Sequence, residues 1–162
     1  MMRVLIPIDG SVLSMRAVDH AARFIHEGEV VLLHVAGIPP QLLEHGGASR
    51  DEEERELECQ VGEQCRRYRQ EILPAIEREV FLPAKERLVR GARGANLVVV
   101  TILAIDASFE PALSILAEAK QHPYDAIIIG RHGRTGLLQF LLGGTAAKLV
   151  HHIQTTPIWL VP

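Results

Sequence analysis

The chain has 162 residues, of which 48% are hydrophobic and only 4% aromatic, so its length and composition fit one domain with an aliphatic core. The formal net charge of −3 excludes the strongly basic surface that drives nucleic-acid binding. The start of the chain has no leader-like pattern and no apolar run reaches the length of about 18 residues that a membrane span needs, so we expect a cytoplasmic protein without a membrane partner.

Five short apolar segments, rich in β-branched residues, are predicted to be strands. They are bounded by Gly, Pro or Asp and span residues 3–8, 29–35, 96–103, 126–129 and 157–161. Their apolar character is continuous rather than alternating, which is typical of parallel strands buried on both faces.

Helical periodicity fills most of the gaps between these segments. Residues 11–26 follow the first strand, with Ser11 as the expected N-cap and Gly28 as the expected terminator. Two shorter helices are predicted over residues 111–120 and 145–152, before the fourth and fifth strands.

The segment 37–91 departs from this regular alternation. It opens with a Pro-Pro pair and a Gly-Gly pair, which are typical of a loop. It continues as a long, highly charged helical pattern over residues 51–90, which Pro74 and Pro83 are expected to break or kink. We interpret this pattern as a helix that covers the sheet with a charged outer face; a separate coiled-coil function is the alternative.

The alternation of strands and helices predicts an α/β fold over residues 1–162. We expect a single domain with one doubly wound, five-stranded parallel sheet, Rossmann-like, with helices on both faces. In such sheets ligands bind beyond the carboxyl ends of the strands, where the strand order reverses. The residues that directly follow each strand are therefore the candidates for a functional site.

Five glycines fall between positions 130 and 144, from the end of the fourth strand to the start of the last helix. Glycines let a backbone approach an anion closely, and the N–H groups at a helix start attract phosphate. The alternative is that these glycines only make turns. The spacing fits neither a P-loop, since no Gly-Lys-Ser/Thr is present, nor the dinucleotide-binding fingerprint.

The pattern Gly130-x2-Gly133-x9-Gly143 resembles the nucleotide loop of the ATP-binding universal stress protein family, whose fold is of the adenine nucleotide alpha hydrolase type. Further stretches agree with the family: its first strand and Asp-x-Ser turn, its second strand, its approach to the loop and its last strand resemble residues 4–11, 33–35, 125–130 and 157–161. The resemblance covers almost the whole chain except residues 37–91, where the family itself varies.

The resemblance implies a site for ATP, or for ADP or AMP, accompanied by Mg²⁺ or Mn²⁺. It implies that Asp9 lies near the ribose or a phosphate-bound metal and that Val35 contacts the adenine. The other implied binding residues are Pro7, Ile8 and Ser11 beside the nucleoside, Gly130, Arg131, His132 and Gly133 along the ribose and phosphates, and Gly143, Gly144, Thr145 and Ala146 at the phosphate-binding helix start.

Gly144 departs from the family pattern, which has Ser or Thr directly after the last motif glycine. A hydroxyl contact is lost there or displaced to Thr145, and losing one hydrogen bond to a charged group costs about 1.5–3 kcal/mol.

Two other polar residues have competing interpretations. Asp9 could cap a helix, but Ser11 is better placed to do so, which leaves Asp9 free for a ligand. His34 is expected to be a hydrogen-bonded core histidine rather than a catalytic one.

These observations favour an ATP-binding regulatory module that dimerises through the last strand, residues 157–161. The alternative, which Gly144 favours, is a nucleotide-free protein-interaction and stress-signalling module of the same fold. An adenylating enzyme would need a signature after the first strand that is missing here. No constellation for covalent catalysis is present, so no catalytic residue is assigned, and at most slow ATP hydrolysis around a metal on Asp9 is expected.

Overall fold

The computed structural model describes residues 1–39, 52–92, 96–106, 110–131 and 142–162, with only the backbone for 52–61. Five strands form one sheet in the order β3-β2-β1-β4-β5, and every neighbouring pair is parallel. The strands are β1 (Arg3–Pro7), β2 (Gly28–Gly37), β3 (Leu97–Asp106), β4 (Ala126–Gly130) and β5 (Ile158–Val161). The predicted α/β fold with a doubly wound parallel sheet is confirmed.

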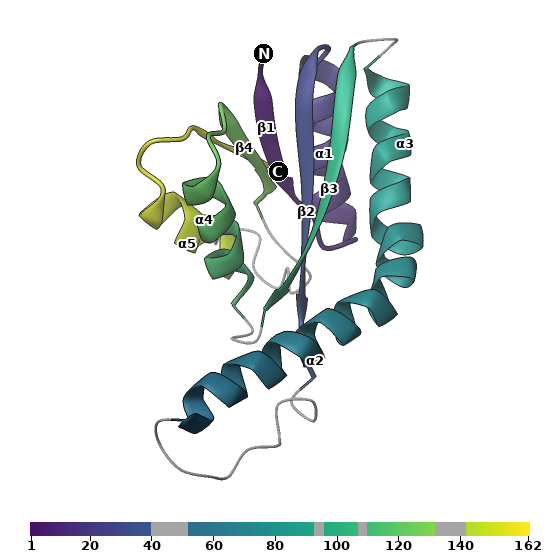
Figure 1. Cartoon of the computed structure of the whole chain (residues 1–162). Coiled ribbons are helices and arrows are strands. Elements are labelled where there is room, and N and C mark those ends of the chain that lie inside the picture. The colour runs from purple at the N-terminus through teal and green to yellow at the C-terminus, as the bar shows by residue number, and fades with distance from the viewer. Residues whose placement is uncertain (40–51, 93–95, 107–109, 132–141) are drawn as a thin grey trace.

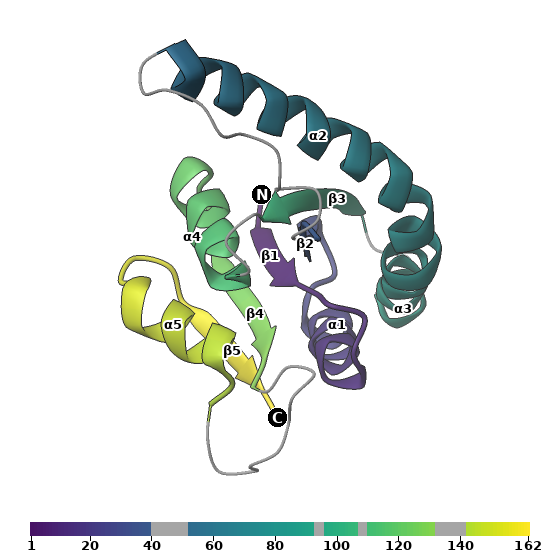
Figure 2. The same cartoon turned by 90° about the horizontal axis from the view of Figure 1, so that it is seen from below.

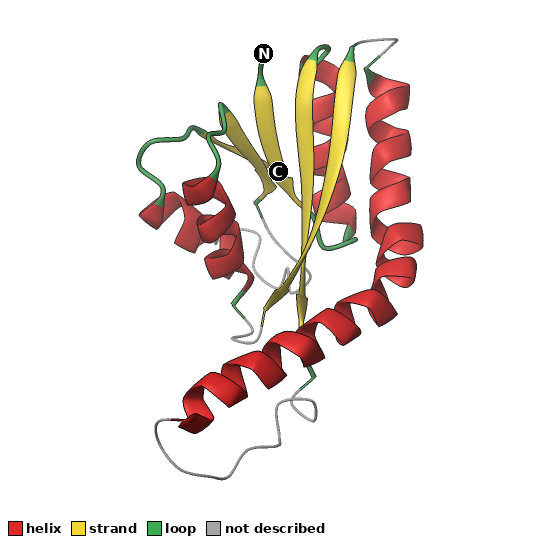
Figure 3. Ribbon diagram, viewed as in Figure 1, coloured by secondary structure: helices red, strands yellow, loops and turns green. Residues whose placement is uncertain are grey.

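Helices cover both faces of this sheet, as predicted (Figures 2 and 3). On one side lie α1 (Val12–Phe24) and α3 (Leu82–Gly91), and on the other lie α4 (Pro111–Gln121) and α5 (Gly144–His152). Ser11 caps α1 as expected, because its hydroxyl accepts the N–H of Ser14 at 3.1 Å.

The expectation for Gly28 is wrong. Helix α1 already ends at its C-cap Ile25, whereas Gly28 opens β2 with φ of +117°. A Cβ at this position would lie 2.2 Å from the carbonyl oxygen of Met2. The glycine is therefore needed for the close approach of two segments of the chain at the amino ends of the strands, not for ending a helix.

The charged segment forms a long helix, α2 (Glu52–Ile76), which continues through a π-helical turn, η2 (Glu77–Phe81), into α3. The N–H of Leu82 bonds to the carbonyl of Glu77, five residues back, and the helix bends at this turn (Figure 1). A kink was predicted, but it lies at the π-helical turn just before Pro83, while Pro74 is accommodated inside α2.

Only part of this segment covers the sheet as predicted. Helix α3 packs on α1, whereas α2 runs past the β3 edge near the carboxyl ends of the strands (Figures 1 and 2). Ile72 and Ile76, near the end of α2, pack against the core. In the parts of the chain that are described, no helix combines the length and the apolar character needed to cross a bilayer.

The core consists of two apolar layers that share the sheet. Val4 and Ile6 face the α1 and α3 side, and Leu5 faces the α4 and α5 side, all with 0% exposure. The central strand β1 is thus buried on both faces, as its continuous apolar sequence predicts. Its carboxyl end is consequently fixed in the middle of the sheet.

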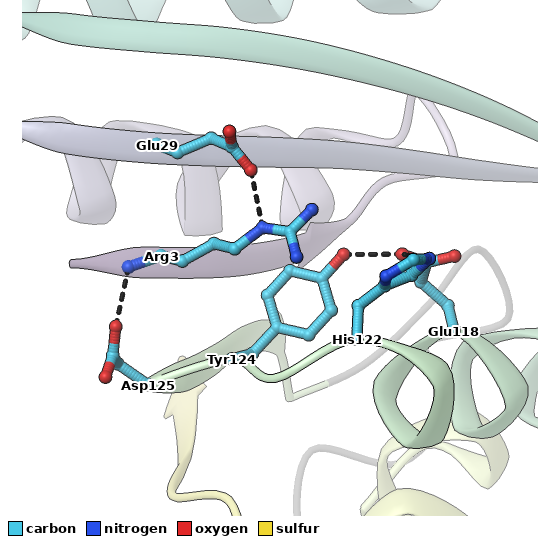
Figure 4. Close-up of polar contacts among 6 residues, drawn as sticks. All are labelled: Arg3, Glu29, Glu118, His122, Tyr124 and Asp125. Carbon is cyan, nitrogen blue, oxygen red and sulfur yellow. Dashed lines mark hydrogen bonds and ion pairs between the residues drawn. The ribbon is translucent and has the colours of Figure 1, made fainter. Parts of the chain in front are cut away.

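The amino ends of the strands are joined by a polar network centred on Arg3 (Figure 4). The Arg3 backbone N–H donates to Asp125 at 2.7 Å, its Nε donates to Glu29 at 2.5 Å, and its guanidinium lies 4.8 Å from the centre of the Tyr124 ring. Tyr124 in turn donates its hydroxyl to Glu118 of α4 at 2.6 Å. Burial, and then the bond to Glu118, raises the pKa of Tyr124, so the phenol stays protonated as the donor.

Candidate functional site

The strand order reverses between β1 and β4. From β1 the chain continues to β2 on one side, whereas from β4 it continues to β5 on the other, and β1 and β4 pair directly. In doubly wound sheets this reversal is where ligands bind, beyond the carboxyl ends of the strands. The residues that follow Pro7 and Gly130 are therefore the first candidates.

The segment after β1 is a tight turn around Asp9. Asp9 Oδ1 accepts the N–H of Ser11 at 3.0 Å, and the N–H of Asp9 donates to the hydroxyl of Ser14 at 3.3 Å. Gly10 lies between them with φ of +78°, a conformation that suits glycine. We expected Asp9 to be free for a ligand. The structure shows that it is only partly free, because one of its oxygens closes this turn.

The carboxyl group of Asp9 is held in its charged form. Burial raises its pKa, but the hydrogen bonds that Ser11 and Ser14 provide have the larger combined effect, so the net pKa lies below the ordinary value. An ionised carboxylate can accept ribose hydroxyls or coordinate a hard cation such as Mg²⁺, which keeps several waters and phosphate oxygens as its other ligands. Among the described residues, no group of three or more His, Cys, Asp or Glu side chains is arranged to hold a metal ion.

Hydrogen bonds of Arg131 link the end of β4 to β5 and to the start of α5. The N–H of Arg131 donates to the carbonyl of Val161 at 2.7 Å, and the carbonyl of Arg131 accepts the N–H of Gly143 at 2.9 Å. Gly143 is the N-cap of α5 and offers no side chain to the first turn of that helix. The start of α5 is consequently fixed beside the carboxyl end of β4.

This arrangement reduces the expected set of phosphate-binding amides from four to three. The N–H of Gly143 is used by Arg131, whereas the first N–H groups of a helix, here those of Gly144, Thr145 and Ala146, have no intrahelical acceptor. Gly144 is exposed, and a Cβ at this position would meet no atom within 4 Å. The fold therefore gives no steric reason for glycine at the position where the family has Ser or Thr.

Val35 lies on β2 beyond the end of β1, since the last residue of β1, Pro7, pairs with Leu33. Its half-buried side chain packs with the apolar layer under α4 and α5. The neighbouring His34 is a hydrogen-bonded histidine, as predicted: its Nδ1 lies 2.8 Å from the carbonyl oxygen of Ile8.

The structure brings most of the predicted site residues to the carboxyl end of the sheet: Pro7, Ile8, Asp9, Ser11, Val35, Gly130, Arg131, Gly143, Gly144, Thr145 and Ala146. His132 and Gly133 lie outside the described residues. Sequence reasoning missed Ser14, a buried residue whose hydroxyl accepts from Asp9 and donates to the carbonyl of Ser11 at 3.0 Å. Its only signal was a second serine three positions after the cap.

Comparisons with known proteins agree with this arrangement. A model of the universal stress protein family matches residues 1–162. No curated protein matches the chain.

Several solved structures share the fold. The hypothetical protein MJ0577 is 22% identical with a TM-score of 0.66, and the match covers 99% of this chain and 94% of that one. The universal stress protein UspA from Lactobacillus plantarum is 20% identical with a TM-score of 0.62, covering 99% and 97%. A universal stress protein solved in complex with cAMP is 17% identical with a TM-score of 0.61, covering 99% and 95%. Identities this low establish the fold alone.

Proposed function

The chain belongs to the universal stress protein family, and we propose that it is a regulatory module that binds ATP, or ADP or AMP, at the carboxyl ends of β1 and β4. One observation carries this proposal. The hydrogen bond between Gly143 and Arg131 holds the start of α5 beside the end of β4. β4 pairs with β1, and β1 leads into the Asp9 turn. The first amides of α5, the backbone of Arg131 and the ionised carboxylate of Asp9 thus flank the point where the strand order reverses.

The chemistry of these groups suggests how a nucleotide is oriented. The amides of Gly144, Thr145 and Ala146 bind phosphate, and Arg131 adds positive charge. Asp9 repels phosphate unless a cation lies between them, so it accepts the ribose hydroxyls or holds Mg²⁺ or Mn²⁺ on the phosphates. Val35 then contacts the adenine. The solved relative that contains cAMP supports an adenine nucleotide as the ligand class.

Two substitutions at Gly144 test this proposal, with calorimetric titration of ATP, ADP and AMP in the presence of Mg²⁺ as the measurement. Gly144→Asp puts a carboxylate at the helix start, where the dipole tolerates it but phosphate does not. Like charges in contact cost several kcal/mol, so we expect affinity to fall by about 100-fold or more. Gly144→Ser adds the missing hydroxyl and should tighten binding by about tenfold.

The matched control is Gly62→Asp on α2, where a Cβ also meets no atom within 4 Å. It should leave the affinity unchanged. If the wild-type protein binds none of the three nucleotides, the proposal is wrong. If only Gly144→Ser binds, the alternative of a nucleotide-free interaction module is favoured, since Gly144 is then the residue that removes the activity.

We propose further that β5 pairs with β5 of a second copy. In the described sheet β5 is an edge strand with Trp159 and Leu160 exposed by 36% and 38%. Beside it, Phe24 of α1 is 60% exposed, with its ring 6.4 Å from that of Trp159. An apolar edge of this kind favours strand pairing with another chain. Leu160→Lys should convert a dimer into a monomer in sedimentation analysis, whereas a wild-type protein that is monomeric at high concentration would refute the idea.

A further inference from the structure

Ile8, the residue before Asp9, is bonded to β2 through both its N–H and its carbonyl group. Its N–H donates to the carbonyl of Leu33 at 2.8 Å, and its carbonyl oxygen lies 2.8 Å from Nδ1 of His34. A carbonyl can only accept, so Nδ1 of His34 carries the proton and donates it. β1 itself ends at Pro7, so these two bonds extend its attachment to β2 as far as the first residue of the Asp9 turn.

The π-helical turn η2 packs behind the same turn. The ring of Phe81, which is 1% exposed, meets the ring of His34 edge-on, with centroids 6.4 Å apart and planes at 87°. The neighbouring Val80 lies against Gly10, since its Cγ2 would be 3.4 Å from a Cβ built there. Two successive residues of one irregular turn therefore contact both His34 and the middle of the Asp9 turn. Single π-helical turns are often found at functional sites.

We propose that His34, Val80 and Phe81, which we call the brace, position the Asp9 turn for its nucleotide. His34 fixes the carbonyl of Ile8, Phe81 fixes the plane of the His34 ring, and Val80 fills the open side of Gly10. These are positioning residues, which act on the ligand only through the turn that they hold. The choice of ligand rests on the proposed function, whereas the hold on the turn is a property of the free protein.

Two substitutions of His34 separate its hydrogen bond from its bulk. His34→Leu removes the donor but still fills the position with a side chain. His34→Asn keeps an N–H donor, at the same number of bonds from Cβ as Nδ1 of histidine. His26→Leu, at an exposed position before β2, is the control. Phe81→Leu is a second, independent variant that keeps the core filled in case His34→Leu does not fold.

The first measurement is amide hydrogen exchange of the free protein by NMR. In His34→Leu the N–H of Ser11, which bonds to Asp9, should exchange about tenfold faster, the factor that corresponds to one net hydrogen bond. The N–H of Ile127 in the core should keep its rate, because the effect is local rather than a global loss of stability. His34→Asn should restore slow exchange at Ser11, and Phe81→Leu should show a smaller rise.

The second measurement is ATP affinity with Mg²⁺, expected to weaken about tenfold in His34→Leu and to return to within about twofold in His34→Asn. Unchanged exchange at Ser11 in both His34→Leu and Phe81→Leu overturns the brace, and so does faster exchange without any loss of affinity. A wild-type protein that binds no nucleotide overturns the proposed function instead, while the exchange data still decide whether the brace holds the turn.

Discussion

The two ends of the parallel sheet are built by different means. At the amino ends, long side chains cross between elements: Arg3 contacts Glu29, Tyr124 and Asp125, and Tyr124 contacts Glu118 (Figure 4). At the carboxyl ends, backbone groups and short side chains close tight local turns, such as the Asp9 turn and the start of α5, and His34 adds a bond from β2 to Ile8. The first end uses its polar groups on itself, whereas at the second the first amides of α5 have no intrahelical acceptor and, with the Asp9 carboxylate, are proposed to bind a ligand.

This difference indicates a division of labour. Polar groups that satisfy one another contribute to stability, whereas helix amides without an intrahelical acceptor and an ionised carboxylate can be satisfied by a bound molecule. Substitutions at the amino ends should therefore change stability and leave nucleotide affinity unchanged. Substitutions at the carboxyl ends should change affinity more than stability.

The largest effect is expected at Gly28, at the amino ends. Gly28→Ala would put a Cβ 2.2 Å from the backbone oxygen of Met2 at a φ of +117°. The segments that carry residues 2 and 28 must then move apart. We expect the free energy of unfolding to fall by about 3 kcal/mol or more. Chemical denaturation measures the loss, and ATP titration of the folded fraction should give the wild-type affinity. A loss below 1 kcal/mol would mean that the strand ends separate at little cost.

Gly10 provides the matched substitution at the carboxyl ends. Its φ of +78° also disfavours a side chain, but a Cβ would lie 3.4 Å from Val80, an ordinary contact. Gly10→Ala should therefore cost about 1–2 kcal/mol of stability, from backbone strain alone. Because it strains the turn that carries Asp9, it should weaken ATP binding, which Gly28→Ala should not. Equal affinities for the two variants would contradict the division of labour.

How much of this could be read from the sequence depends on the distance over which a signal acts. Ser11 as a cap and the apolar strands are local signals and were predicted correctly. The bond between His34 and Ile8 joins residues 26 apart, and the bond between Arg3 and Asp125 joins residues 122 apart. Such partners depend on strand order and register, which periodicity alone does not specify.

Gly28 shows the same limit from the other side. A glycine after a helical pattern can have two physical roles: it can end the helix, or it can permit the close approach of another segment of the chain. The sequence favoured the first, but the neighbour that decides, Met2, is far away along the chain. The π-helical turn was missed because Pro83 predicts a break without specifying its geometry. In the structure one wider turn precedes Pro83, and its residues Val80 and Phe81 lie against Gly10 and His34.

A smaller effect is expected at Tyr124. Tyr124→Phe removes the donor to Glu118, whose side chain is only 14% exposed, so the carboxylate loses a partner in a poorly solvated place. We expect a loss of about 1–2 kcal/mol in the free energy of unfolding and no change in ATP affinity. Tyr68→Phe on α2 is the control and should change neither. A weaker affinity in Tyr124→Phe would show that the two ends are coupled.

The smallest effect is the pH dependence that Asp9 contributes. Its pKa in the folded protein is lowered, because the hydrogen bonds from Ser11 and Ser14 outweigh burial. A lowered folded pKa stabilises the protein at pH values above the unfolded pKa, about 3.9, and the contribution disappears as the pH falls through the folded pKa. Wild type should therefore be more stable than Asp9→Asn at pH 7, and this difference should shrink below about pH 4.

Thermal unfolding of the two proteins from pH 7 to pH 3 measures this difference, and the titration of all other groups cancels in the comparison. A difference that stays constant with pH would mean that the charge on Asp9 does not stabilise its turn. A difference that grows toward low pH would mean that burial dominates and the folded pKa is raised. In that case Asp9 would bind metal and ribose only after paying for its own ionisation, and the carboxyl end would lose the group that most clearly distinguishes it from the amino end.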